Sequence, residues 1–249
     1  MTDHSEFIRD TQNRTAAVLM IHGIVGSPAH FKNLIDVIPE DMTLHNILLD
    51  GHGKGVADFG RSSMKKWKEQ VSGETNALLQ THSKVFIVAH SMGTLFAINE
   101  AIKNPDKICC LFLLSVPTRP HVRFSTIITS LKAMWVGKGE DVDRMLADTS
   151  INLSPYLWKY LSWIPRYAEL LSEVVRTRKI LPALKTPTLT FQSFTDELVS
   201  ARSVKDVEGH PYIKNTILYN SGHFAYGDED TALLRAELKK CIDKIKLGQ

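Results

Sequence analysis

The sequence predicts one α/β domain with a mostly parallel central sheet flanked by helices. Short apolar runs alternate with longer amphipathic segments, a pattern typical of parallel strands joined by helices. The apolar runs show no period of two, as expected of strands buried on both faces. At 249 residues, 43% of them apolar, the chain can form one sizeable core without a second domain.

Six short segments rich in β-branched and leucine residues are predicted as strands. In chain order they are residues 16–21, 44–49, 85–89, 108–115, 188–191 and 216–219. Four segments between and after them are predicted as helices: residues 31–38, 63–81, 94–103 and 230–246. The last has apolar residues close to helical spacing, so it is expected to cover one face of the sheet.

Residues 117–182 interrupt the alternation because they contain no convincing buried strand. Pro155 and Pro165 divide this stretch into short pieces. Its aromatic residues are Trp135, Tyr156, Trp158, Tyr160, Trp163 and Tyr167. So long an insertion in a compact fold is usually functional, for example as a lid. We therefore predict a core of residues 1–116 and 183–249, with residues 117–182 as a helical lid insertion.

Ser91 is the candidate nucleophile. It follows the predicted strand 85–89 and precedes a helix-like segment, in the sequence AHSMG. A sharp strand-to-helix turn would expose its hydroxyl, and such a turn needs tiny residues two before and two after the serine. Gly93 fits, and Ala89 replaces the more usual first glycine. The alternative is a serine that only caps the start of a helix.

A serine hydroxyl needs a base, and the base needs a group that orients it. His223 follows the strand 216–219 in NSGHF, where small residues permit a tight loop. Asp196 follows the strand 188–191 and is the candidate third member. Taken singly, His223 is one of ten histidines, and Asp196 could form an Asx-turn. Glu197 is a neighbouring alternative that is expected to point elsewhere on the loop.

Two backbone N–H groups are predicted to form an oxyanion hole. The N–H of Met92 lies at the start of the helix after Ser91. The N–H of Ile24 lies in HGIVG, after the strand 16–21, where Gly23 is expected to let the backbone turn. The alternative is a glycine-rich turn that merely ends the strand.

These elements together resemble the α/β-hydrolase superfamily along the whole chain. The matching stretches are HGIVGSP, LLDGHGKG, AHSMG, the Asp196 loop and SGH. Within the superfamily the chain looks like bacterial carboxylesterases and monoacylglycerol lipases. The resemblance implies a triad of Ser91, Asp196 and His223, an oxyanion hole at Ile24 and Met92, and a lid before the strand 188–191.

Two positions depart from the pattern of the superfamily. Ala89 replaces a glycine, and Ser193 stands where a glycine often precedes the acid. Neither difference removes a reacting group. Asp50 and His52 could suggest a metal site, but we interpret them as loop-shaping residues.

The predicted activity is hydrolysis of carboxylic esters through an acyl-enzyme on Ser91, without a metal or an organic cofactor. The expected substrate is a small ester with an apolar acyl or aromatic group, and the aromatic residues of the insertion either line its pocket or pack the lid onto the body. The same triad would also serve a thioesterase, an amidase or peptidase, a carbon–carbon bond hydrolase or a lactonase. A catalytically silent binding protein of the same fold is the rival from another class.

The remaining features predict a cytoplasmic protein. The polar amino terminus lacks the order of a signal peptide, and no apolar stretch approaches the roughly 20 residues of a membrane span. Cys109 and Cys110 are adjacent, so we expect their side chains on opposite sides of a strand, packed in a reducing compartment. The net charge is only +3 and the basic runs are interrupted, so we expect solvated faces rather than a nucleic-acid surface.

Overall fold

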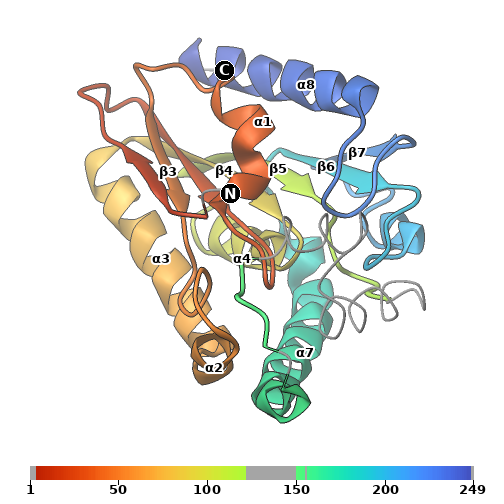
Figure 1. Cartoon of the computed structure of the whole chain (residues 1–249). Helices are drawn as coiled ribbons and strands as arrows, with labels where there is room; N and C mark the ends of the chain where they lie inside the picture. Colours follow the sequence, from red (N-terminus) through yellow and green to blue (C-terminus); the bar gives the residue numbers. More distant parts are fainter. Residues whose placement is uncertain (1–3, 122–149, 155, 248–249) are drawn as a thin grey trace.

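The computed structural model describes residues 4–121, 150–154 and 156–247 and places a seven-stranded sheet at their centre (Figure 1). The strands are β1 (Phe7–Arg9), β2 (Ala16–Ile21), β3 (Thr43–Ile47), β4 (Lys84–His90), β5 (Ile108–Leu114), β6 (Thr188–Ser193) and β7 (Ile213–Leu218). Their order is β1-β3-β2-β4-β5-β6-β7. Every neighbouring pair is parallel except β1 and β3. The predicted fold class is confirmed.

Helices cover both faces of the sheet. They are η1 (Pro28–Phe31), α1 (Lys32–Ile35), α2 (Val56–Arg61), α3 (Met64–Thr81), α4 (Met92–Lys103), η2 (Leu157–Trp163), α7 (Ile164–Ile180), η3 (Leu181–Ala183), η4 (Ala201–Asp206) and α8 (Asp228–Lys246). Helices α1 and α8 lie on one side of the sheet, and α3, α4 and α7 lie on the other (Figure 1).

Strand β2 shows why the apolar runs lack a period of two. Ala16, Val18 and Met20 pack with α1 and α8, while the alternate residues of the strand pack with α3 and α4. All six of its side chains are fully buried. A strand covered on both faces needs apolar residues at every position.

All six predicted strands are present; β2 has the predicted bounds, and the other five have shifted ends. Strand β6 continues to Ser193, and β7 begins at Ile213, three residues before its predicted start. Strand β1 was not predicted from the sequence. This edge strand has only three residues and half-exposed side chains, so it carries no apolar run.

The insertion contains one long helix where the sequence suggested short pieces. Pro165 lies in the first turn of α7, where a missing N–H costs no helical hydrogen bond. It therefore begins a 17-residue helix rather than breaking one. Residues 122–149, with Trp135, and Pro155 lie outside the described residues. The role of residues 117–182 as a lid stays a prediction.

Two aromatic residues of the insertion pack it against α2. Trp163 donates from Nε1 to the carbonyl of Val56 at 2.9 Å and contacts the ring of Phe59, with centroids 4.6 Å apart. Tyr160 packs against Trp163. Tyr156 and Trp158 are instead 50% and 64% exposed. Trp163 and Tyr160 therefore pack the insertion onto the body of the protein, which is one of the two roles predicted for its aromatic residues.

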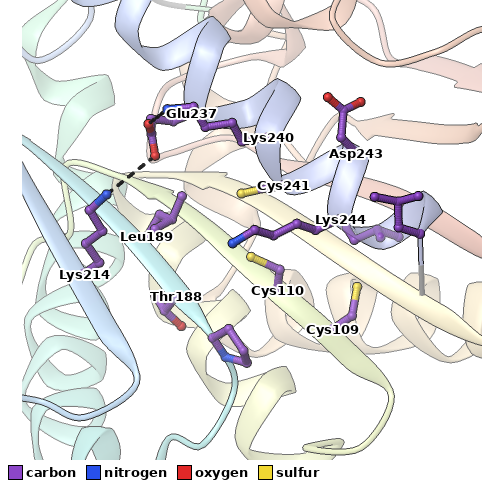
Figure 2. A pocket seen from close by; sticks show the side chains of 13 residues that line it. Cys109, Cys110, Thr188, Leu189, Lys214, Glu237, Lys240, Cys241, Asp243 and Lys244 are labelled. Atoms are coloured by element: carbon purple, nitrogen blue, oxygen red, sulfur yellow. Dashed lines mark hydrogen bonds and ion pairs between the residues drawn. The ribbon is translucent and has the colours of Figure 1, made fainter. Parts of the chain in front are cut away.

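The prediction that Cys109 and Cys110 point to opposite sides of their strand is wrong. The pairing of β4 with β5 shifts between Val85 and Phe86, so that Ile108 and Cys110 have strand partners and Cys109 is the extra residue. A bulge of this kind breaks the alternation of side chains. Both cysteines pack on the α8 side and line one cavity with Cys241 (Figure 2).

Within residues 4–121, 150–154 and 156–247, no helix combines the length and hydropathy that crossing a membrane requires.

Candidate active site

The parallel sheet gathers the predicted site at one edge. Ile24 follows β2, Ser91 follows β4, Asp196 follows β6 and His223 follows β7. These four strands are parallel, so the loops after them leave from the same, carboxyl edge. Residues nearly 200 positions apart in the sequence therefore lie at the same edge of the sheet.

Ser91 occupies the turn between β4 and α4 with a positive φ of 49° and a ψ of −123°. Its side chain makes no capping hydrogen bond to α4, which does not support the alternative of a simple helix cap. Instead, the backbone is fixed on both sides. Its N–H donates to the carbonyl of Leu114 at 2.9 Å, and its carbonyl accepts from the N–H of Thr94 at 2.9 Å. The backbone of the turn is thus held by β5 on one side and by the first turn of α4 on the other.

Two glycines allow other chain segments to approach the turn. A Cβ on Gly93 would lie 2.3 Å from the carbonyl oxygen of Ile21, and one on Gly23 would lie 2.8 Å from the Cβ of Ser91. Ala89 is completely buried in β4, so its methyl group fits where a glycine is more usual. The predicted need for a tiny residue two positions after Ser91 is explained by the close approach of Ile21 to Gly93. Gly23 is needed for a second close approach, to the Cβ of Ser91.

Asp196 and His223 form a buried pair. His223 donates from Nδ1 to Asp196 at 2.9 Å to Oδ2 and 3.0 Å to Oδ1. Oδ1 also accepts from the N–H groups of Leu198 and Val199 at 2.8 and 2.7 Å. Both side chains are almost fully buried.

The environment of Asp196 keeps its carboxylate ionised. Burial raises its pKa, but the hydrogen bond and charge of His223, together with the N–H groups of Val199 and Leu198, outweigh burial and leave the pKa below its ordinary value. Because a carboxylate only accepts, the proton of neutral His223 must sit on Nδ1. The lone pair of Nε2 then remains to accept a proton.

The loop after β2 turns at Val25 rather than at Gly23. Val25 has a positive φ of 52°, and the N–H of Gly26 closes the turn on the carbonyl of Gly23 at 3.1 Å. Gly23 has no positive φ, and its role is the close approach to Ser91. The predicted turn after β2 is present, but its positive φ is at Val25 and not at Gly23.

His22 supports this loop. Its Nε2 accepts from the N–H of Leu49 at 3.0 Å, so its proton lies on Nδ1, which donates to the carbonyl of Gly23 at 2.8 Å. Burial, and the nearby His52, hold the pKa of His22 well below its ordinary value. A neutral imidazole thereby links the ends of β2 and β3.

The N–H groups of Ile24 and Met92 were predicted to form the oxyanion hole, which stays a prediction. Among the described residues, neither donates to a backbone carbonyl. Met92 is the first residue of α4, where N–H groups lack helical partners. Both residues adjoin the contact between Gly23 and Ser91.

Two residues that were not predicted as part of the site contact His223. His90, directly before Ser91, places its ring against that of His223, with centroids 4.8 Å apart. Glu197 was expected to point elsewhere but accepts from the backbone N–H of His223 at 2.7 Å. Adjacency to Ser91 and Asp196 was the only signal for either residue, and adjacency alone does not predict a contact.

Asp50 and His52 shape the loop after β3. The carbonyl of Asp50 accepts from Nε1 of Trp67 at 2.8 Å, and His52 lies buried against the rings of His22 and Trp67. Burial lowers the pKa of His52 to about 4.

The cavity of Figure 2 belongs to another part of the molecule. It has a volume of about 730 Å³ and lies where β5 and β6 begin, beneath α8. Ser91 lies at the opposite end of these strands. Cavity volume therefore does not identify the candidate site, whereas the arrangement of side chains does.

No family model matches the sequence, and no curated protein matches it. Solved structures do resemble it. The structure described as that of the metagenome-derived lipolytic enzymes LipS and LipT shares 19% identity and a TM-score of 0.73, covering 98% of this chain and 97% of that one. A monoacylglycerol lipase from Paleococcus ferrophilus shares 16% identity and a TM-score of 0.65, covering 94% and 98%.

A third similar structure is a meta-cleavage product hydrolase from Pseudomonas fluorescens. It shares 15% identity and a TM-score of 0.61, covering 96% of this chain and 94% of that one. At such identities the likeness shows a common fold over nearly the whole chain.

Proposed function

We propose that this chain, which has the α/β-hydrolase fold, is a serine hydrolase that cleaves carboxylic esters. The observation that carries the proposal is the buried hydrogen bond from His223 Nδ1 to Asp196 at 2.9 Å, at the sheet edge that also holds Ser91. This bond leaves Nε2 of His223 as a base. A buried, ionised carboxylate behind it stabilises the imidazolium that forms during proton transfer.

The proposed reaction has two steps. His223 accepts the proton of Ser91 while Oγ attacks the ester carbonyl, and the N–H groups of Ile24 and Met92 stabilise the oxyanion. The alcohol leaves with the proton from His223, and an acyl-enzyme remains on Ser91. Water, deprotonated by His223, then attacks the acyl carbonyl; the bond to Ser91 breaks, Oγ takes the proton back from His223, and the acid is released. These steps require no metal or organic cofactor.

The substrate is proposed to be a small ester with an apolar acyl or aromatic group. Two of the similar structures are described as lipolytic enzymes or a monoacylglycerol lipase, and they have the higher TM-scores. The exposed side chains of Tyr156 and Trp158 offer apolar surface on the insertion. A series of p-nitrophenyl esters of increasing chain length tests this proposal, and a flat response would count against a defined acyl site.

Carbon–carbon bond hydrolysis is the second candidate, because the third similar structure is a meta-cleavage product hydrolase. Thioesters and amides are further candidates for the same three side chains. Panels of esters, thioesters and amides with matched acyl chains, together with a vinylogous diketone substrate, separate these activities. Turnover confined to the diketone would replace the ester proposal.

The main test compares wild type with Ser91→Ala in p-nitrophenyl butyrate hydrolysis. We expect kcat to fall by roughly 10³-fold or more, since removal of a nucleophile abolishes the covalent route. Circular dichroism should be unchanged. Equal activity of the two folded proteins would refute the role of Ser91.

A further inference from the structure

The backbone of His223 is held from both sides. Its N–H donates to Oε2 of Glu197 at 2.7 Å, and its carbonyl accepts from Nε2 of His90 at 2.9 Å. The imidazole is held separately, by Asp196. The main chain of the proposed base is therefore fixed by two side chains that take no part in the proposed reaction.

His90 connects the base to the nucleophile's own strand. It is the last residue of β4 and is covalently bonded to Ser91, so its hydrogen bond ties the loop of His223 to the turn of Ser91. A carbonyl can only accept, so Nε2 of His90 carries the proton. His90 is 1% exposed, and its ring packs against the rings of both His223 and Phe224.

His90 can bind the carbonyl of His223 without adding a charge to the site, because its own imidazole is neutral. Burial, and then the proximity of His223 and His30, hold the pKa of His90 well below its ordinary value, with smaller opposing effects from the carbonyl of His223 and from Asp196. A neutral neighbour does not oppose formation of the His223 imidazolium. Its Nδ1 is buried, with no hydrogen-bond partner among the described residues.

Glu197 connects the base to the loop of its acid partner, because it follows Asp196 directly. A Cβ on Gly222 would lie 2.6 Å from Oε1 of Glu197, so a glycine at this position allows the carboxylate to reach the N–H of His223. A second bond joins the same loops, from Oγ1 of Thr195 to the carbonyl of Ser221 at 2.7 Å. The two loops therefore form one hydrogen-bonded unit.

We propose that His90 and Glu197 are positioning residues that clamp the main chain of His223 and so fix its Nε2 relative to Ser91. This inference rests on the proposed function. Proton transfer requires hydrogen-bond geometry, and a displacement of about 1 Å can cost about 100-fold in rate. The clamp should therefore affect kcat rather than substrate binding.

Paired variants separate the hydrogen bonds from the bulk of the side chains. Glu197→Ala removes the acceptor and Glu197→Gln retains one, while His90→Phe keeps a ring without a donor and His90→Gln keeps a donor without a ring. With p-nitrophenyl butyrate, the Ala and Phe variants should lose about 10- to 100-fold in kcat with little change in KM. Both Gln variants should recover most of that loss.

A third variant disturbs the contact between Glu197 and the N–H of His223 without removing the side chain of Glu197 or of His90. Gly222→Ala places a methyl group against the Glu197 carboxylate and should lower kcat like Glu197→Ala. Because it leaves both side chains in place, it tests the clamp even where a truncation at position 90 or 197 prevents folding. Lys239→Ala, on the exposed face of α8, should leave kcat unchanged.

The rate of labelling by a fluorophosphonate gives a second readout, because it also depends on His223 as the base. Wild-type rates in folded Glu197→Ala, His90→Phe and Gly222→Ala would overturn the clamp and leave the proposed function standing. Equal losses in each Gln variant and its Ala or Phe counterpart would also overturn it. A wild type that neither hydrolyses esters nor labels would overturn the proposed function, and this inference with it.

Discussion

Ser91 has a backbone conformation that residues other than glycine rarely adopt. Such a conformation costs about 1–3 kcal/mol and persists only where the surroundings impose it. Here the surroundings are hydrogen bonds from the N–H of Ser91 to Leu114 and from Thr94 to its carbonyl. The strained backbone conformation therefore lies at the residue proposed as the nucleophile, which supports that proposal.

Asp196 should make the stability of the protein depend on acidity. Its folded-state pKa lies below the ordinary 3.8, so the ionised carboxylate stabilises the fold at higher pH. That contribution is present above the unfolded-state pKa and is lost as the pH falls through the folded-state pKa. Denaturation curves from about pH 6 to pH 3 should therefore show a steeper loss of unfolding free energy in wild type than in Asp196→Asn. Identical pH slopes would contradict this account of Asp196.

At the scale of elements, the turn between β4 and α4 depends on Gly93. Gly93→Ala should lower the unfolding free energy by about 1–3 kcal/mol, since its methyl group would collide with the carbonyl of Ile21. Gly73 in α3 has open space around its Cβ position. Gly73→Ala should therefore raise stability by about 0.5–1 kcal/mol. Urea denaturation measures both changes in unfolding free energy. Similar changes for Gly93→Ala and Gly73→Ala would rule out the steric explanation.

Helix α7 is attached to α3 and α4 by a buried carboxylate. Glu173 accepts from Lys68 at 3.0 Å, from Arg176 at 2.8 Å and from Nδ2 of Asn99 at 3.2 Å. Glu173→Ala should cost about 1.5–3 kcal/mol, the range for hydrogen bonds to charged groups.

Lys239 provides the matched control for Glu173. It forms an exposed pair with Asp243, and Lys239→Ala should change stability by less than about 0.5 kcal/mol. Hydrogen exchange should also show faster exchange in α7 of Glu173→Ala than in wild type. Unchanged exchange there would mean that other contacts hold the helix.

The elements that the sequence predicted well are those whose signal is local. Strand β2 has six fully buried apolar side chains, and such a run is visible without any partner. Strand β1 pairs through its backbone at an exposed edge and has no such signal. The bulge that turns Cys109 toward α8 likewise depends on the register with β4, which no local pattern encodes.

At the scale of the whole molecule, the placement of the candidate site was predictable because the strands that carry it are parallel. Loops that follow parallel strands meet at one edge, so Ser91, Asp196 and His223 could be expected together before any distance was known. The contacts of His90 and Glu197 with His223 join three loops, and their geometry appears only in the fold.

The central claim is that Ser91 is activated as a nucleophile by His223 and Asp196. Its most direct test is to treat the native and the heat-unfolded protein with a fluorophosphonate and to map the adduct by peptide mass spectrometry. Native wild type should carry one adduct, on Ser91, that is absent from the unfolded protein and strongly reduced in His223→Ala. An unlabelled Ser91 in native protein, or labelling that survives His223→Ala at the wild-type rate, would contradict the account.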